Sequence, residues 1–179
     1  MTAAATRLTL VSHAMTDAMS AGCFPVDEPL SALGRRQVGR LDSAAARAFT
    51  GPEQRTRQTA ELLGLQAAAD PRLMDLDCGS WRGRALESIP PADLEVWLTD
   101  PGQSPHGGES IVGLVGRVAG WLRQIDDSVR TVAVTHPAVI RAAILVALDA
   151  PPKSFWRMDV APASHTVLHR RGGAWTLRI

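Results

Sequence analysis

The fold is decided by one stretch of the sequence, Thr131-Val-Ala-Val-Thr-His-Pro-Ala-Val-Ile-Arg-Ala-Ala-Ile-Leu-Val-Ala-Leu148. Its first five residues are β-branched or apolar and predict a buried strand. The residues from Pro137 to Leu148 predict a helix behind that strand, because a proline suits the first helical position, where its missing N–H costs little. A strand that passes through a single histidine, His136, into a helix is the repeating unit of an α/β protein.

The rest of the chain continues this alternation of strands and helices. We predict strands over residues 7–12 and 48–50, helices over 31–47, 55–64, 92–98 and 109–125, and a hairpin from 164–170 and 174–179. We therefore expect one α/β domain over residues 1–179, a three-layer sandwich with a mainly parallel sheet and helices on both faces. Residues 70–105 are interrupted by Pro and Gly and are predicted to form a loop-rich lid segment over the site.

Composition and charge limit the classes of function. The 179 residues are 45% hydrophobic and 21% charged, an ordinary balance for a globular protein. The formal net charge is +1, whereas a protein that binds DNA or RNA normally presents a strongly basic face. The longest clean apolar runs, such as residues 142–148, are too short to span a membrane. We therefore expect neither nucleic acid nor a membrane as a partner, and the oligomeric state leaves no sign in the sequence.

The N-terminus and the cysteines favour a cytoplasmic protein. Residues 1–7 lack the charged start, the apolar stretch and the cleavage site of a secretory signal. Cys23 and Cys78 are far apart in the sequence, and we expect both to be reduced thiols. No Cys or His spacing predicts a metal site, and no glycine-rich phosphate loop predicts a nucleotide, so we expect neither a metal nor another cofactor.

Two predicted strands end in histidine, His13 and His136. In an open parallel sheet, ligands bind outside the carboxyl ends of the strands, so the two imidazoles can meet there. A single histidine at a strand end is more often a polar residue with an ordinary partner, but a pair suits phosphoryl transfer, which needs a nucleophile and cations. His136 also begins a helix, whose free N–H groups favour a phosphate. Arg55 could bind two phosphate oxygens, although alone it is more typical of a solvated basic helix start.

Six segments, in order along the chain, resemble the motifs of the histidine phosphatase superfamily, which includes the phosphoglycerate mutase-like proteins. They are residues 10–16, 30–37, 55–60, 73–83, 107–110 and 134–141. Each motif alone is weak, whereas six in order are highly specific. The resemblance implies a metal-independent phosphomonoesterase that acts on a small phosphorylated substrate, and it implies the same α/β sandwich. We prefer a phosphatase to a mutase, because the chain is short and lacks the longer insertions of the mutases.

The resemblance also assigns roles to individual residues. His13 would be the nucleophile that becomes phosphohistidine, with Arg55 and His136 as phosphate ligands and catalytic partners. Asp75 would be the acid that protonates the leaving oxygen, if the pocket raises its pKa. Asp77 is close in sequence and could take its place.

The side chains at two further motif positions, Ser12 and Thr16, would also contact the phosphate. Ser12 departs from the family, which has an arginine there. The absence of that arginine should cost about 1.5–4 kcal/mol of phosphate stabilisation, or roughly 10- to 10³-fold in rate. Arg82 or Arg84 could compensate. Three further departures lie nearby, with Ala14 and Pro137 in place of glycine and Met19 in place of asparagine.

These departures leave two hypotheses open. The first is a working phosphatase slowed by the missing arginine, and the second is a catalytically impaired pseudoenzyme that binds a phosphorylated ligand or a protein partner. The remaining candidates look structural: the five tryptophans are expected to pack in the core or in loops, and His106 and His165 to lie on the surface or in loops.

Overall fold

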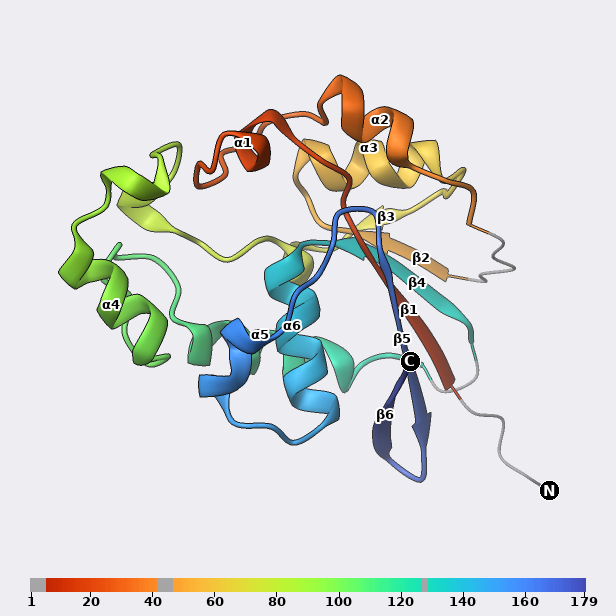
Figure 1. The fold of residues 1–179 in the computed structure, drawn as a ribbon. Coiled ribbons are helices and arrows are strands. Elements are labelled where there is room, and N and C mark those ends of the chain that lie inside the picture. Colours follow the sequence, from red (N-terminus) through yellow and green to blue (C-terminus); the bar gives the residue numbers. More distant parts are fainter. Residues whose placement is uncertain (1–5, 42–46, 127–128) are drawn as a thin grey trace.

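A six-stranded sheet forms the centre of the protein (Figure 1), in a computed structural model that describes residues 6–41, 47–126 and 129–179. The strand order is β3-β2-β4-β1-β5-β6. Their bounds are β1 (Thr6–Ser12), β2 (Arg47–Thr50), β3 (Ala68–Ala69), β4 (Thr131–Thr135), β5 (His165–Arg171) and β6 (Ala174–Arg178). Strands β3, β2, β4 and β1 are parallel, and the β5–β6 hairpin adds antiparallel strands at the β1 edge.

Helices cover both faces of this sheet. Their bounds are α1 (Asp17–Ser20), α2 (Ala32–Gln37), α3 (Gln54–Leu62), α4 (Pro91–Thr99), α5 (Ile111–Leu122) and α6 (Pro137–Ala147), with 3-10 turns η1 (Pro71–Leu73), η2 (Gly79–Trp81), η3 (Leu86–Ser88) and η4 (Pro152–Arg157). Figure 1 shows α2 and α3 on one face and α5 and α6 on the other. The expected three-layer α/β sandwich with a mainly parallel sheet is therefore confirmed.

The core divides along the sheet because successive side chains of a strand point to opposite faces. On β1, Leu8 and Leu10 belong to the larger cluster, which includes the apolar faces of α5 and α6. Val11 faces the other way and packs with Val134 of β4 and Ala60 of α3. All of these side chains are buried, and each large one contributes roughly 1.5–3 kcal/mol. This packing holds β1 and β4 rigidly side by side, which matters for the site at their ends.

The predicted helix over residues 31–47 is wrong beyond Gln37. Ser31 caps α2 by accepting a hydrogen bond from the Gly34 N–H, as expected for a helix start. Val38 then leaves the helical region, with φ −68° and ψ 111°, and Gly39 follows it. A glycine at this place lowers helix stability by about 1 kcal/mol relative to alanine, so the helix ends there. Residues 42–46 of the predicted helix lie outside the described residues.

The segment 70–105 has little regular structure beyond three 3-10 turns and α4. Two glycines allow the backbone near residues 77–79 to contact the backbone at residues 106–108. A Cβ at Gly79 would lie 2.1 Å from the carbonyl oxygen of His106, and a Cβ at Gly108 would lie 2.0 Å from the carbonyl oxygen of Asp77. Only glycine permits so close a contact between two backbones. His106 lies in a turn, one of the two places expected for it, but its side chain is buried rather than on the surface, with its ring 5.1 Å from that of Trp81.

Two further observations concern the described part of the chain as a whole. None of its helices has the length and apolar character needed to cross a lipid bilayer. Cys23 and Cys78 are both free thiols.

Candidate active site

His13 and His136 meet at the carboxyl ends of two neighbouring strands. β1 and β4 are parallel and in register, with Ser12 opposite Thr135, so each histidine is the first residue after its strand. The backbone N–H of His13 donates to the carbonyl oxygen of Thr135 at 2.9 Å. The two ring centroids are 5.2 Å apart, and both side chains are buried. The sheet thus joins two residues that are far apart in the sequence, as their strand ends predict.

The imidazole of His13 is held in one orientation. Its Nδ1 lies 2.8 Å from the carbonyl oxygen of Ala14. A carbonyl oxygen only accepts a hydrogen bond, so Nδ1 carries the proton and Nε2 keeps its lone pair. Burial, assisted by the charge of His136, lowers the pKa of His13 to about 3. The ring is therefore neutral over the ordinary range of pH, which is the form that acts as a nucleophile.

This low pKa predicts a pH-dependent loss of stability. Below about pH 6.5 the unfolded chain gains a proton on His13, but the folded protein does not until about pH 3. The free energy of unfolding should therefore fall with decreasing pH in this window, by up to about 1.4 kcal/mol per pH unit from this residue. His13→Gln, which has no such proton, should reduce the slope measured by urea unfolding between pH 4 and 6.5. An unchanged slope in His13→Gln would contradict the burial argument.

His136 is bound by the carboxylate of Glu53, a residue that no sequence motif indicates. Its Nε2 lies 2.8 Å from Glu53 Oε2 and donates to it. Burial alone would raise the pKa of Glu53, but the hydrogen bond and the charge of His136 outweigh burial and lower that pKa. Glu53 also accepts a hydrogen bond from the backbone N–H of Asp75 at 2.9 Å. Glu53 therefore orients His136 and fixes the position of Asp75.

A glycine makes room for this pair. A Cβ at Gly51 would lie 2.9 Å from Glu53 Oε2 and 3.0 Å from His136 Nε2. The turn between β2 and α3 thus brings Glu53 to a histidine 83 positions further along the chain. Nothing in the local sequence pattern indicated the contact, because Glu53 lies just before α3 and reads as an ordinary acidic residue near a helix start.

Arg55 lies on the first turn of α3 and is buried. The simpler interpretation, a solvated arginine at a basic helix start, is therefore wrong. Its Nη1 donates to the carbonyl oxygen of Val26 and its Nη2 to Asp75 Oδ2, both at 2.7 Å. The carboxylate of Glu28 lies 3.7 Å from Nη1. The Nε atom is buried and has no hydrogen-bond partner among the described residues. By contrast, Arg57 on the same helix is exposed, as its position two residues on predicts.

The carboxylate of Asp75 lies between the guanidinium of Arg55 and the ring of His136. Its Oδ2 is 2.7 Å from Arg55 Nη2 and 3.3 Å from His136 Nδ1, the latter without hydrogen-bond geometry. Burial favours a raised pKa, but the charges of His136, Arg55 and His13 outweigh it and lower the pKa of Asp75 to about 2. This is opposite to the raised pKa that we expected of an acid. Asp77 is exposed, accepts from the Gly79 N–H and does not line the cavity.

The other predicted phosphate ligands do not join this group. Ser12 is fully buried, with Oγ 3.5 Å from the carbonyl oxygen of His13, and Thr16 uses its hydroxyl to cap α1 by accepting from Met19 N–H. Neither lines the cavity beside His13. Arg82 and Arg84 are exposed and also lie outside that cavity, so neither is placed to take the role of the arginine that the resemblance expects at position 12.

Two departures from the family pattern are accommodated without strain. Asp149 and Ala163 are the only described residues other than glycine with positive φ, so Ala14 is not strained. Its backbone N–H donates to Thr59 Oγ1 at 3.1 Å. Pro137 occupies the first position of α6 directly after His136, where a proline fits.

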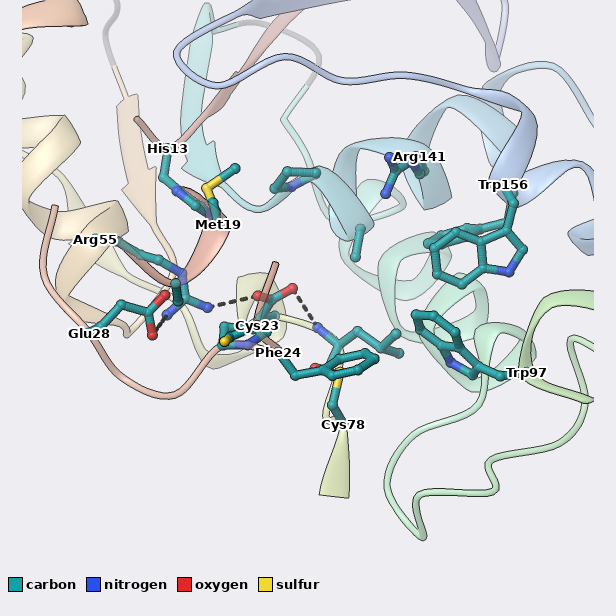
Figure 2. Close-up of a pocket in the computed structure, with 17 residues that line it drawn as sticks. His13, Met19, Cys23, Phe24, Glu28, Arg55, Cys78, Trp97, Arg141 and Trp156 are labelled. Atoms are coloured by element: carbon teal, nitrogen blue, oxygen red, sulfur yellow. Dashed lines mark hydrogen bonds and ion pairs between the residues drawn. The ribbon is translucent and has the colours of Figure 1, made fainter. Parts of the chain in front are cut away.

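A cavity of about 190 Å³ opens in front of His13 (Figure 2). Arg55, Asp75, Glu28 and Arg141 are the other charged residues that line it. The remaining lining is apolar or aromatic, with two cysteines: Ala18, Met19, Cys23, Phe24, Pro25, Leu76, Cys78, Trp97, Pro137, Ala138, Phe155 and Trp156. Figure 2 shows His13, Arg55 and Glu28 toward one side and Arg141, Trp97 and Trp156 toward the other. The cavity thus has a charged end beside the histidines and an aromatic end with one arginine.

Comparisons with known proteins agree with this arrangement. The chain is 28% identical to phosphoserine phosphatase 1 of Hydrogenobacter thermophilus over 181 residues, which cover 91% of this chain and 86% of the relative. A solved structure named mycobacterial hydrolase 1 is 26% identical, with a TM-score of 0.83 and coverage of 98% of this chain and 97% of that one.

The structure of phosphoserine phosphatase from Entamoeba histolytica, solved with 3-phosphoglyceric acid, is 20% identical and shares the fold, with a TM-score of 0.88 over 96% of this chain and 94% of that one. The family model of the histidine phosphatase superfamily (branch 1) matches residues 8–179. With a match of that extent, and with relatives named as phosphatases and phosphoglycerate mutases, the chain belongs to the histidine phosphatase superfamily, branch 1.

Proposed function

We propose that this protein is a metal-independent phosphomonoesterase that forms a phosphohistidine on Nε2 of His13. The observation that carries the proposal is the neutral His13 ring, with Nδ1–H fixed on Ala14 and Nε2 unprotonated at the cavity. A nucleophile prepared in this way needs no base to activate it. The phosphatase names of the relatives support a small phosphorylated substrate.

Two buried nitrogens beside His13 suit a phosphate. Arg55 Nε and His136 Nδ1 have no hydrogen-bond partner among the described residues. A buried polar atom without a partner is costly, and a phosphate oxygen would accept from Arg55 Nε–H and, when the His136 ring carries both protons, from His136 Nδ1–H. The hydrogen bond from Glu53 holds His136 in place for this purpose. Arg55 and His136 are therefore the proposed phosphate ligands, whereas Ser12 and Thr16 would reach the phosphate only if it entered deeper than the cavity lining.

Asp75 is the proposed acid, and the substrate itself would prepare it. The pKa of Asp75 is low because Arg55 and His136 stabilise its charge. A phosphate dianion that competes for those cations, and repels the carboxylate, would raise the pKa. The His13 Nε2–P bond would then form as the bond to the leaving oxygen breaks, with the Asp75 proton passing to that oxygen. Water would next attack phosphorus as the His13 Nε2–P bond breaks, giving one proton to Asp75 and releasing inorganic phosphate and the neutral His13 ring.

The missing arginine should make this enzyme slow. The cations that line the cavity, among the residues described here, are Arg55 and Arg141, and Arg55 already pairs with Asp75. A phosphate site with one arginine fewer should lose roughly 10- to 10³-fold in rate. The same neutralised Arg55 favours the alternative, a pseudoenzyme that binds a phosphorylated ligand or a protein partner without turnover. The two functions differ in whether a covalent phosphoenzyme forms.

The wider setting belongs to the same proposal. We place the protein in the cytoplasm as a single domain over residues 1–179, with neither nucleic acid nor a membrane as partner. The near-neutral formal charge of +1 supports the part of this proposal that concerns nucleic acid, because proteins that bind DNA or RNA normally present a strongly basic face. Residues 70–105 would act as the lid segment, which is supported by the contribution of Asp75, Leu76, Cys78 and Trp97 to the cavity lining.

The test is to trap the intermediate. The wild type is mixed with a ³²P-labelled aryl phosphate in EDTA and quenched in base, because phosphohistidine survives base and is lost in acid. We expect a labelled protein whose label maps to His13. The rate at which the label appears should be at least as large as kcat. Label that survives acid, or turnover that disappears in EDTA, would contradict the metal-independent phosphohistidine route. Saturable phosphate binding without label or turnover would favour the pseudoenzyme.

A further inference from the structure

The aromatic end of the cavity is not needed to hold a phosphate. Phe24, Trp97 and Trp156 form a connected group: the rings of Trp97 and Trp156 are 4.3 Å apart between centroids, and those of Phe24 and Trp97 are 5.6 Å apart. All three line the same cavity as His13. Aromatic rings packed in this way provide flat apolar surface with specific edge and face contacts. This end therefore suits the part of a substrate that leaves with the oxygen.

Arg141 is fixed over this aromatic group. It lies on α6, five residues after His136, and its Nε donates to the carbonyl oxygen of Met158 at 2.8 Å. Its Cζ atom is 5.7 Å from the ring centroid of Phe155 and 5.8 Å from that of Trp156. Cation–π contacts of this kind hold a guanidinium in one plane. Figure 2 shows the side chain projecting from α6 near Trp156.

The terminal nitrogens of Arg141 are left for a ligand. Neither Nη1 nor Nη2 makes a hydrogen bond or an ion pair with any residue that the structure describes. The two carboxylates in the cavity lie at Arg55 instead, Asp75 at 2.7 Å and Glu28 at 3.7 Å. Burial lowers the pKa of Arg141 despite the charges of Asp159 and Asp75. A half-buried cation without a paired anion is a site where an acidic group of a ligand gains charged hydrogen bonds.

From these contacts we propose that the substrate is a phosphate monoester of a planar aromatic alcohol that also carries a carboxylate, and that Arg141 binds this carboxylate while the aromatic group packs against the ring. The inference rests on the proposed function, since it names the substrate class of the same site. A volume of about 190 Å³ agrees with one ring, because an apolar cavity of about 150 Å³ accepts benzene. Arg141 is then a specificity-determining residue rather than a catalytic one.

The test compares two esters that differ in one charge, 4-carboxyphenyl phosphate and its amide, 4-carbamoylphenyl phosphate. Their phenols are of similar acidity, so the chemistry of the leaving group is matched. In Arg141→Met we expect kcat/KM to fall roughly 10- to 100-fold for the acid and less than about threefold for the amide. Most of the loss should appear in KM, because the contact is made in the bound substrate as well as in the transition state.

Three controls make the result specific. Arg141→Lys keeps the charge and should recover part of the activity on the acid. Arg82→Met, which removes an exposed arginine outside the cavity, should change neither ester. Trp156→Leu should lower kcat/KM for both aryl esters by roughly 3- to 10-fold relative to glycerol 2-phosphate. An equal loss on the acid and the amide in Arg141→Met, or no loss on either, would overturn the proposal.

A binding experiment separates this inference from the proposed function. The product analogue 4-hydroxybenzoate is titrated into the wild type and Arg141→Met, with tryptophan fluorescence as the signal. If no ester is hydrolysed but 4-hydroxybenzoate binds the wild type at least about tenfold more tightly than Arg141→Met, the phosphatase proposal fails and the subsite stands. If esters are hydrolysed and the analogue binds both proteins equally, the phosphatase stands and the subsite fails.

Discussion

Replacing His13 with glutamine is expected to lower kcat for phosphate ester hydrolysis by at least about 10³-fold, because the covalent route ends with the loss of its nucleophile. Glutamine can still donate a hydrogen bond to the carbonyl oxygen of Ala14, so the backbone at the end of β1 should keep its geometry. The measurement is the hydrolysis of an aryl phosphate from pH 4.5 to 8, with the folded state checked by circular dichroism.

The control for this result is His165→Gln, at the exposed start of β5, which should leave kcat unchanged. The low pKa of His13 also means that its protonation cannot limit turnover in the free enzyme within the tested range. If His13→Gln keeps more than about a tenth of the wild-type kcat, another residue carries the reaction and the phosphohistidine route is wrong.

Replacing Arg55 with methionine should reduce both stability and activity. The substitution leaves Asp75 beside the cavity without its 2.7 Å partner, and the loss of one member of a buried ion pair costs about 3–5 kcal/mol of unfolding free energy. We also expect kcat/KM to fall by about 10²- to 10³-fold, since a cation that stabilises the transferred phosphoryl group is lost. Arg57→Met, on the exposed side of the same helix, should change stability by less than about 0.5 kcal/mol.

A double variant separates the two effects. In Arg55→Met/Asp75→Asn the unpaired charge is also removed, so about 1–3 kcal/mol of stability should return, as measured by urea unfolding. Activity should not return, because both a phosphate ligand and the acid are absent. Recovery of activity together with stability would mean that Arg55 supports the fold alone and takes no part in binding phosphate.

The layers of the fold could be predicted from the sequence because each depends on a local pattern. The predicted strand over residues 131–135 and the predicted helix start at Pro137 have the same bounds in the structure. The buried apolar run defines the strand, and the proline after it defines where the helix begins. Gly64, with φ +76°, ends the α3 region as expected of a glycine after a helix. The predicted helix from residue 31 failed where the apolar spacing continued but the backbone turned away after Gln37.

The site was less predictable because it depends on contacts between distant segments. His13 and His136 could be paired, since the ends of parallel strands share one edge of the sheet. The role of Glu53 could not, because its contact with His136 depends on the turn at Gly51. Arg141 follows His136 by five residues on an apolar helix, and the sequence does not say that it faces the cavity. The low pKa of Asp75 likewise comes from neighbours that only the folded chain brings together.

The ion pair between Asp75 and Arg55 has a consequence for how the protein would behave among cellular metabolites. A built-in carboxylate already occupies the guanidinium that a free anion would seek, so any small anion must displace it before it can bind. An ester gains further contacts at the aromatic end of the cavity, whereas inorganic phosphate gains none there. Product inhibition by inorganic phosphate should therefore be weak, and turnover should continue at phosphate concentrations that saturate a site with a free arginine.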